Sequence, residues 1–330
     1  MDGLIRHLVP TRNMQARPRA VGAVSLLAAA AVLLDAGAAI AGGPWGADYF
    51  PNVPLITQNG RIVRFYDDLL KGKAVAINLI YTRCSASCPL ETAKLVHVQR
   101  LLGNRVGKDV FFYSISIDPK HDTPEVLKAY AERFHVGPGW LFLTGKEEDI
   151  RLVSKKLGLS ALTDAWSRDG HQPALMVGNE ATGEWMRNSA IENPKFLATM
   201  MSDFFGWKNG KPVRTYAESV QVPRDGKGNY LFQTRCAACH TIGRGDGLGP
   251  DLLNVTARRE RSWLARYLAE PDRMLAEGDE LAKELFAKYR NVRMPNLGLD
   301  SEEVSALLSH IDGESRAAVE QARTVPVPTR

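Results

Sequence analysis

The run Cys236-Ala237-Ala238-Cys239-His240 has the most informative spacing of reactive side chains in this chain. In such a C-x-x-C-H run, each sulfur can add to one vinyl group of a porphyrin, and the histidine can bind the iron. A C-x-x-C pair can also be half of a zinc site or a thioredoxin-type redox pair. The other two of the four cysteines lie far away, so no local second pair completes a zinc site. The run therefore predicts one covalent haem c, attached through Cys236 and Cys239 and ligated by His240.

A sixth ligand for the haem iron is predicted at Met294. Its thioether is a soft ligand, and Pro295 stiffens the loop that presents it. Met274 and His310 are the alternatives, together with an open sixth position.

The second cysteine pair, Cys84 and Cys88, is followed by Pro89 and lies where a predicted buried strand meets a predicted helix. Four residues make about one helical turn, so both sulfurs can face the same point. The helix N-terminus favours the thiolate of Cys88. Such a pair could form a disulfide, act as a redox dithiol or hold a soft metal. His171 precedes another predicted strand, and two thiolates with one imidazole suit copper.

Strand and helix patterns alternate from residue 45 to about 207, which predicts an α/β domain. The apolar run 74–81 predicts a buried central strand, and the periodicity of 90–102 predicts the helix after the cysteine pair. Further strands are predicted in a hairpin at 55–63 and at 110–117, 141–144, 174–177 and 184–187, with helices at 123–134, 147–157 and 194–205.

Residues 225–313 are predicted to form a second, all-helical domain around the haem. Its helices are expected at 230–235, 262–270, 280–289 and 301–311, the last opened by an Asp300/Glu303 capping box. Turn formers and charges without a period mark 207–224 as a linker. The polar tail 314–330 is expected to be disordered.

Residues 1–41 are typical of an export signal. An arginine-bearing start precedes the apolar stretch 20–34, and Ala39-Ile40-Ala41 is a cleavage pattern before Gly42. An uncleaved anchor is the alternative, because 20–41 is long enough to span a bilayer, although Asp35 is costly there. Both interpretations place the folded part outside the cytoplasmic membrane, in the periplasm of a bacterium, where a cysteine pair can be oxidised.

The length and the net charge of the chain bear on the number of domains and on the class of partner. The 330 residues exceed one typical domain. The formal net charge is +5, of which +2 falls in residues 1–41, too little to favour nucleic acid as a partner.

Residues 225–313 resemble class I cytochromes c, in which C-x-x-C-H lies near the start and Met-Pro precedes the last helix. Gly249-Pro250 fits the same family, in which a carbonyl at this proline orients the proximal imidazole. A simple turn is the alternative interpretation of that dipeptide.

Residues 47–206 resemble the SCO/SenC family of thioredoxin-fold copper proteins. Cys84 to Pro89 matches the family's C-x-x-x-C-P, and Ser116 to Pro119 with Asp122 to Pro124 matches its S-x-D-P and D-T-P segments. His171 falls at the family's ligand histidine, although Gly170 separates it from the aspartate that commonly comes directly before. The resemblance implies a thioredoxin-like fold in which Cys84, Cys88 and His171 bind copper.

The two resemblances together predict an exported copper-binding and electron-transfer protein whose haem exchanges electrons with the Cys/Cys/His site. The first resemblance implies copper delivery, or reduction of target cysteines, for the binuclear copper centre of a cytochrome c oxidase subunit; another periplasmic redox protein is the alternative partner. A haem-linked thiol-disulfide oxidoreductase or peroxidase, with Cys84 or Cys88 as nucleophile and no copper, is a second hypothesis. An electron carrier with a docking domain is the third. Membrane contact is expected only through an uncleaved N-terminal segment.

Overall fold

A seven-stranded sheet forms the first folded part of the chain. The computed structural model describes residues 45–159, 172–207 and 226–324. The strand order is β2-β1-β5-β4-β3-β6-β7, in which β3, β4 and β5 run parallel and the others pair antiparallel. The strands are β1 (Pro54–Thr57), β2 (Ile62–Arg64), β3 (Ala74–Ile80), β4 (Val110–Ser116), β5 (Trp140–Thr144), β6 (Ala174–Asn179) and β7 (Glu184–Ser189). This is the predicted thioredoxin-like α/β sheet.

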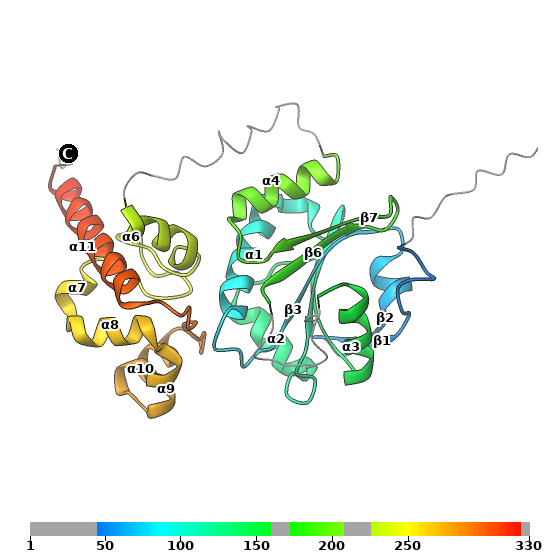
Figure 1. The fold of residues 1–330 in the computed structure, drawn as a ribbon, viewed down its shortest axis with the longest axis horizontal. Helices are drawn as coiled ribbons and strands as arrows, with labels where there is room; N and C mark the ends of the chain where they lie inside the picture. The colour runs from blue at the N-terminus through cyan, green and yellow to red at the C-terminus, as the bar shows by residue number, and fades with distance from the viewer. Residues whose placement is uncertain (1–44, 160–171, 208–225, 325–330) are drawn as a thin grey trace, which may run out of the picture. The chain divides into compact units, whose positions relative to one another are not determined.

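Helices cover both faces of the sheet (Figure 1). They are η1 (Phe65–Leu70), α1 (Cys88–Leu102), η2 (Gly103–Arg105), α2 (Pro124–Arg133), α3 (Glu147–Lys156) and α4 (Pro194–Phe204). Side chains alternate along β3, so Ala76 and Ile80 pack into the core under α1, α2 and α4, while Val75 and Ile77 pack toward η1 and α3. Burial on both faces explains the continuous apolar run that predicted this strand.

The second folded part is all helical, as predicted. Its helices are α6 (Gly226–Leu231), η3 (Phe232–Cys236), α7 (Val255–Arg258), α8 (Arg261–Ala269), α9 (Pro271–Glu277), α10 (Glu280–Lys288) and α11 (Ser301–Thr324). A Cβ on Gly228 would lie 2.1 Å from the Ala306 carbonyl oxygen, so only glycine lets α6 approach α11 this closely. The capping box of α11 is confirmed: Glu303 N donates to Asp300 Oδ1 (2.8 Å), and Asp300 N donates to Glu303 Oε2 (3.2 Å).

The prediction of a disordered tail from residue 314 is wrong for residues 314–324, which continue α11. This segment is rich in alanine, glutamate, glutamine and arginine, all strong helix formers. Ser315 is buried, and its hydroxyl accepts a hydrogen bond from Asn254 N at 3.0 Å, which fixes the extended helix to the loop before α7. The predicted leader, most of the predicted linker and residues 325–330 lie outside the described residues.

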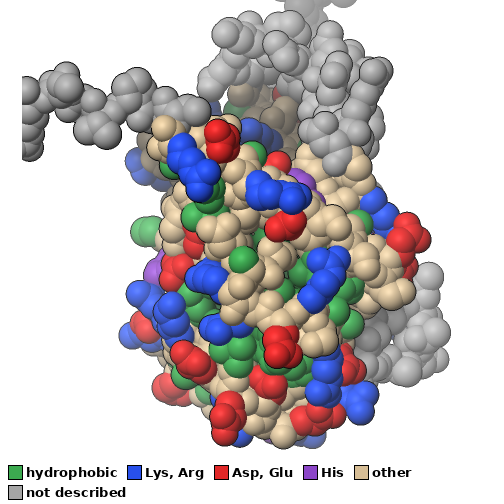
Figure 2. Space-filling view, turned by 90° about the vertical axis from the view of Figure 1, so that its left-hand side faces the viewer, with side chains coloured by type: hydrophobic (Ala, Val, Ile, Leu, Met, Phe, Trp, Pro, Cys, Tyr) green, Lys and Arg blue, Asp and Glu red, His purple; other side chains and the backbone are tan. Residues whose placement is uncertain are grey.

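The surface of the helical part carries paired charges. On α8 and α9, Arg266 and Arg273 both form ion pairs with Glu270 and Glu277. On the face drawn in Figure 2, basic and acidic side chains lie intermixed rather than gathered into a field of one sign. Within the described ranges, no helix is long and apolar enough to cross a membrane.

Candidate functional site

Cys84 and Cys88 lie at the junction between β3 and α1, where the sequence places them. A turn follows β3, in which Cys84 N donates to the Tyr81 carbonyl at 3.2 Å, and α1 begins at Cys88 with Pro89 in its first turn. Both cysteines are free thiols with exposures of 2% and 0%. The sulfurs interact directly, because the Cys88 thiol hydrogen-bonds to Cys84.

The two thiols of this pair have opposite acidities. The hydrogen bond from Cys88, supported by the N–H groups of Cys88 and Ala86 against the effect of burial, lowers the pKa of Cys84 to about 6. The same hydrogen bond, together with burial and the nearby Glu91, raises the pKa of Cys88 well above its usual value. Cys84 is therefore the more acidic thiol of the pair, and the prediction that the helix N-terminus favours the thiolate of Cys88 is wrong.

A buried polar chain lies under the pair. Glu91 on α1 is fully buried, and burial raises its pKa to about 8. Its carboxylate accepts hydrogen bonds from Ser87 Oγ (2.7 Å) and Asn78 Nδ2 (3.3 Å). Asn78 Oδ1 in turn accepts from Ser114 Oγ at 2.7 Å on β4. Periodicity alone does not indicate Glu91, because it lies on a helix buried on almost every side.

The third predicted ligand of this site, His171, lies outside the described residues. Among the residues that are described, no group of three histidine, cysteine or carboxylate side chains is placed to hold a metal ion. Within the described residues, the soft side chains at this site are therefore the thiols of Cys84 and Cys88 alone.

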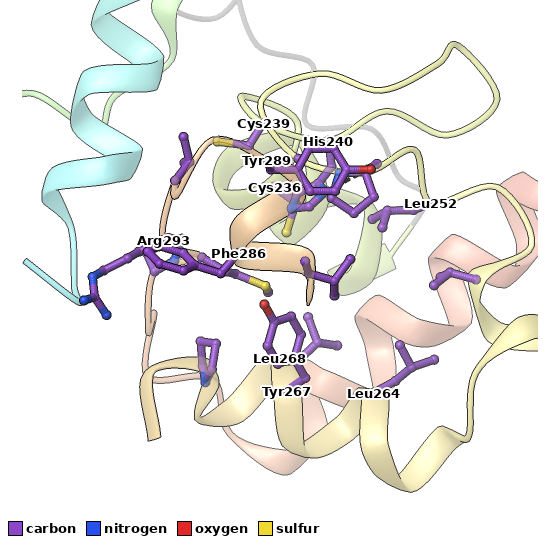
Figure 3. Close-up of a pocket in the computed structure, with 18 of the residues that line it drawn as sticks. Cys236, Cys239, His240, Leu252, Leu264, Tyr267, Leu268, Phe286, Tyr289 and Arg293 are labelled. Atoms are coloured by element: carbon purple, nitrogen blue, oxygen red, sulfur yellow. Dashed lines mark hydrogen bonds between the residues drawn. The ribbon is translucent and has the colours of Figure 1, made fainter. Parts of the chain in front are cut away.

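The second site is an apolar cavity in the helical part. Figure 3 shows Cys236, Cys239 and His240 on one side of it and Tyr267 and Leu268 on the opposite side. The remaining lining is largely apolar and includes Leu252, Val255, Leu264, Leu285, Phe286, Leu307 and Ile311. Burial raises the pKa of both Cys236 and Cys239 to about 12, in contrast to Cys84. Two sulfurs and an imidazole at the edge of an apolar cavity suit a covalently attached porphyrin.

His240 is oriented by its backbone surroundings. Its Nδ1 lies 2.9 Å from the Pro250 carbonyl oxygen, which can only accept, so Nδ1 carries the proton and Nε2 is free to bind a metal. Burial lowers the pKa of this imidazole and keeps it neutral. A Cβ on Gly249 would lie 2.5 Å from His240 Cε1, so the chain passes directly against the ring. The Gly249-Pro250 dipeptide therefore orients the ring and is more than a simple turn.

The three candidate sixth ligands occupy different environments. Met294 lines the same cavity as His240. Met274 is not among the residues that line it; it lies on α9 with 1% exposure, as a core residue. His310 packs on Phe232, with ring centroids 5.5 Å apart. The placement favours Met294.

Asp251 holds the loop that follows the haem-binding run, a role that no pattern indicated. Its carboxylate accepts hydrogen bonds from Thr241 Oγ1 and from the N–H groups of Gly243, Arg244, Gly245 and Leu253, at 2.5 to 2.9 Å. Partial burial alone would raise the pKa of Asp251, but these donors hold it well below its usual range. The loop that carries the Pro250 carbonyl is thereby fixed next to His240.

Fold and sites together define a fusion of two domains: a thioredoxin-like domain with a buried cysteine pair and a helical domain of the cytochrome c type. Residues 47–174 match the family model described as SCO1/SenC, and residues 226–314 match that of cytochrome c. The chain therefore joins an SCO1/SenC domain to a cytochrome c domain, as the sequence predicted.

Known proteins resemble the first domain. A SCO2-like protein of Rickettsia felis is 41% identical over 102 residues, which cover 31% of this chain and 47% of that protein. The chain thus spans about half the length of the curated relatives it matches. A SCO1/SenC family lipoprotein from Bacillus anthracis is 27% identical, with a TM-score of 0.41, over 48% of this chain and 94% of that one. Copper-bound ScoI of Bradyrhizobium japonicum is 26% identical, with a TM-score of 0.38, over 47% and 99%.

Proposed function

We propose that this chain is an exported copper-binding and electron-transfer protein that delivers copper, or reduces target cysteines, during assembly of cytochrome c oxidase. Cys84, Cys88 and His171 hold the copper, and the partner is the oxidase subunit that carries the binuclear copper centre. The observation that carries the proposal is the presence, in one chain, of a cysteine pair with one lowered pKa and a separate cavity edged by C-x-x-C-H.

The haem cavity has residues suited to electron transfer. Haem c, when bound, supplies one-electron chemistry in an apolar surround. Cys236 and Cys239 anchor it covalently, while the Pro250 carbonyl holds His240 in the tautomer that presents Nε2. Met294, which lines the same cavity, would supply the second protein ligand of the iron. Electrons are exchanged between this domain and the Cys84–Cys88 site, and the fusion keeps the two partners at high local concentration.

One observation favours a second function, that of a haem-linked thiol-disulfide oxidoreductase or peroxidase without copper. A pKa of about 6 makes Cys84 a thiolate at neutral pH, as a nucleophile requires.

Metal analysis of the full chain purified from the periplasm separates the two functions. We expect one iron and one copper per chain, with the copper removed by a soft chelator and the haem retained. A chain that holds iron but takes up no copper, and that consumes peroxide in this copper-free form through Cys84, would support the thiol enzyme instead.

A further inference from the structure

A buried carboxylate that is not one of the proposed copper ligands accepts hydrogen bonds from the turn that carries Cys84. Asp122 follows β4 and is fully buried. Its Oδ1 accepts from Thr82 Oγ1 at 2.5 Å, and its Oδ2 accepts from Thr82 N at 3.1 Å and from Ser116 Oγ at 2.6 Å. A single side chain thus fixes both the backbone and the hydroxyl of Thr82, two residues before Cys84.

The strand register explains why Asp122 reaches this turn. β3 and β4 are parallel, with Ile80 opposite Ser116, and Ile117 N donates to the Ile80 carbonyl at 2.8 Å. Beyond that point the ladder ends and β3 passes into the turn closed by Cys84 N and the Tyr81 carbonyl. The hydrogen bonds of Asp122 continue the connection between β3 and β4 beyond the last strand pair. Without them, the turn after β3 would be held only by its own hydrogen bond.

We propose that Asp122 is a positioning residue for the Cys84–Cys88 pair: by fixing Thr82, it holds the Cys84 sulfur within reach of the Cys88 sulfur and thereby favours disulfide formation and copper binding. The copper part of this inference rests on the proposed function, whereas the disulfide part does not. Formation of the disulfide joins the two sulfurs and removes two electrons and two protons, which a disulfide oxidant such as oxidised glutathione takes up as it becomes two thiols.

The direction of the effect follows from effective concentration. A fixed turn keeps the two sulfurs at a high effective concentration toward each other and toward a shared metal. Loosening the turn lowers that concentration, so the disulfide becomes easier to reduce and the metal is held less tightly. Groups that orient a ligand from outside the coordination sphere typically contribute about 10- to 100-fold in metal affinity.

Asp118 offers a matched control on the same loop. Its carboxylate pairs with Arg83 Nη2 at 2.9 Å and His121 Nδ1 at 3.0 Å, on side chains that are 50% and 48% exposed. Asp118 is itself 5% exposed, so Asp118→Asn removes the same charge as Asp122→Asn from a similarly buried site close to the same cysteine pair, but its ion-pair partners are half-exposed side chains and not the backbone of Thr82.

The test uses the full, haem-loaded chain in glutathione redox buffers and in competition with a copper chelator. For Asp122→Asn, we expect the dithiol–disulfide equilibrium to shift about tenfold toward the dithiol, or about 30 mV for this two-electron couple, and copper to bind about tenfold more weakly. Thr82→Val, which loses only the hydroxyl contact, should shift the dithiol–disulfide equilibrium and the copper affinity in the same direction. Thr82→Ser, which keeps the hydroxyl, should leave both at their wild-type values. Asp118→Asn should change each by less than about twofold. Haem absorbance and thermal unfolding report whether each variant is folded.

Wild-type equilibria in both Asp122→Asn and Thr82→Val would overturn the positioning role, as would an equal shift in Asp118→Asn, which would indicate a general charge effect. These results would contradict the positioning role only. A different result, unchanged copper binding in Cys84→Ser, would contradict the proposed function. The glutathione equilibrium needs no metal and decides the positioning role in either case.

Discussion

We expect Cys84→Ser and Cys88→Ser each to weaken copper binding by more than about a hundredfold, because each removes one of the two proposed soft ligands, a larger loss than that of an outer-sphere group. His171→Ala is expected to weaken binding as well, by removing the imidazole. The haem spectrum should not change in any of the three, because the substitutions lie in the other domain. Chelator competition measures the affinities, and the haem absorbance is recorded in the same samples.

His121→Ala is the control for His171→Ala. His121 pairs with Asp118, close to the cysteine turn, and is about half exposed. If Cys84, Cys88 and His171 are the three ligands, His121→Ala should bind copper as tightly as the wild type. If His171→Ala binds as tightly as the wild type while His121→Ala does not, the third ligand is His121.

Met294→Ala should abolish the methionine-to-iron charge-transfer band of the ferric protein and open the sixth position, because Met294 lines the cavity with His240. Visible and near-infrared absorbance of the purified ferric protein records the band. Met274→Leu is the matched control: this buried core methionine can be replaced by a side chain of similar volume at a modest cost in stability, with the band retained. Persistence of the band in Met294→Ala would exclude Met294 as the ligand.

Several elements of both domains could be predicted because their local sequence signals agree with the fold. The apolar run of β3, Pro89 at the start of α1 and the capping box before α11 each carry their own physical cause. The C-x-x-C-H run needs no tertiary information to predict a haem, since its chemistry is complete within five residues.

Other features depend on contacts between distant segments and could not be predicted. Asp122 lies 40 residues after Thr82, and only the register of β3 against β4 brings them together. Met274 is a core residue and Met294 lines the cavity, a difference in burial that the sequence alone does not show. The contact between Ser315 in the extension of α11 and the loop before α7 likewise joins segments that are distant in the sequence.

Electron exchange between the two domains is the central claim, and stopped-flow absorbance of the haem tests it most directly. The full chain, with Cu(I) at the first site and ferric haem, is compared with an equimolar mixture of two full-length variants. One is Cys84→Ser/Cys88→Ser, which carries only haem; the other is Cys236→Ser/Cys239→Ser, which carries only copper. We expect one electron to pass from Cu(I) to the ferric haem within the same wild-type chain.

We expect the wild-type rate of haem reduction to be independent of protein concentration and, at about 1 μM, to exceed that of the mixture by up to about a thousandfold. This follows because a tether gives an effective concentration in the millimolar range. The mixture should react in proportion to its concentration. Equal rates in the two samples, or no haem reduction in either, would contradict the account and leave the fusion with a role in docking or co-targeting alone.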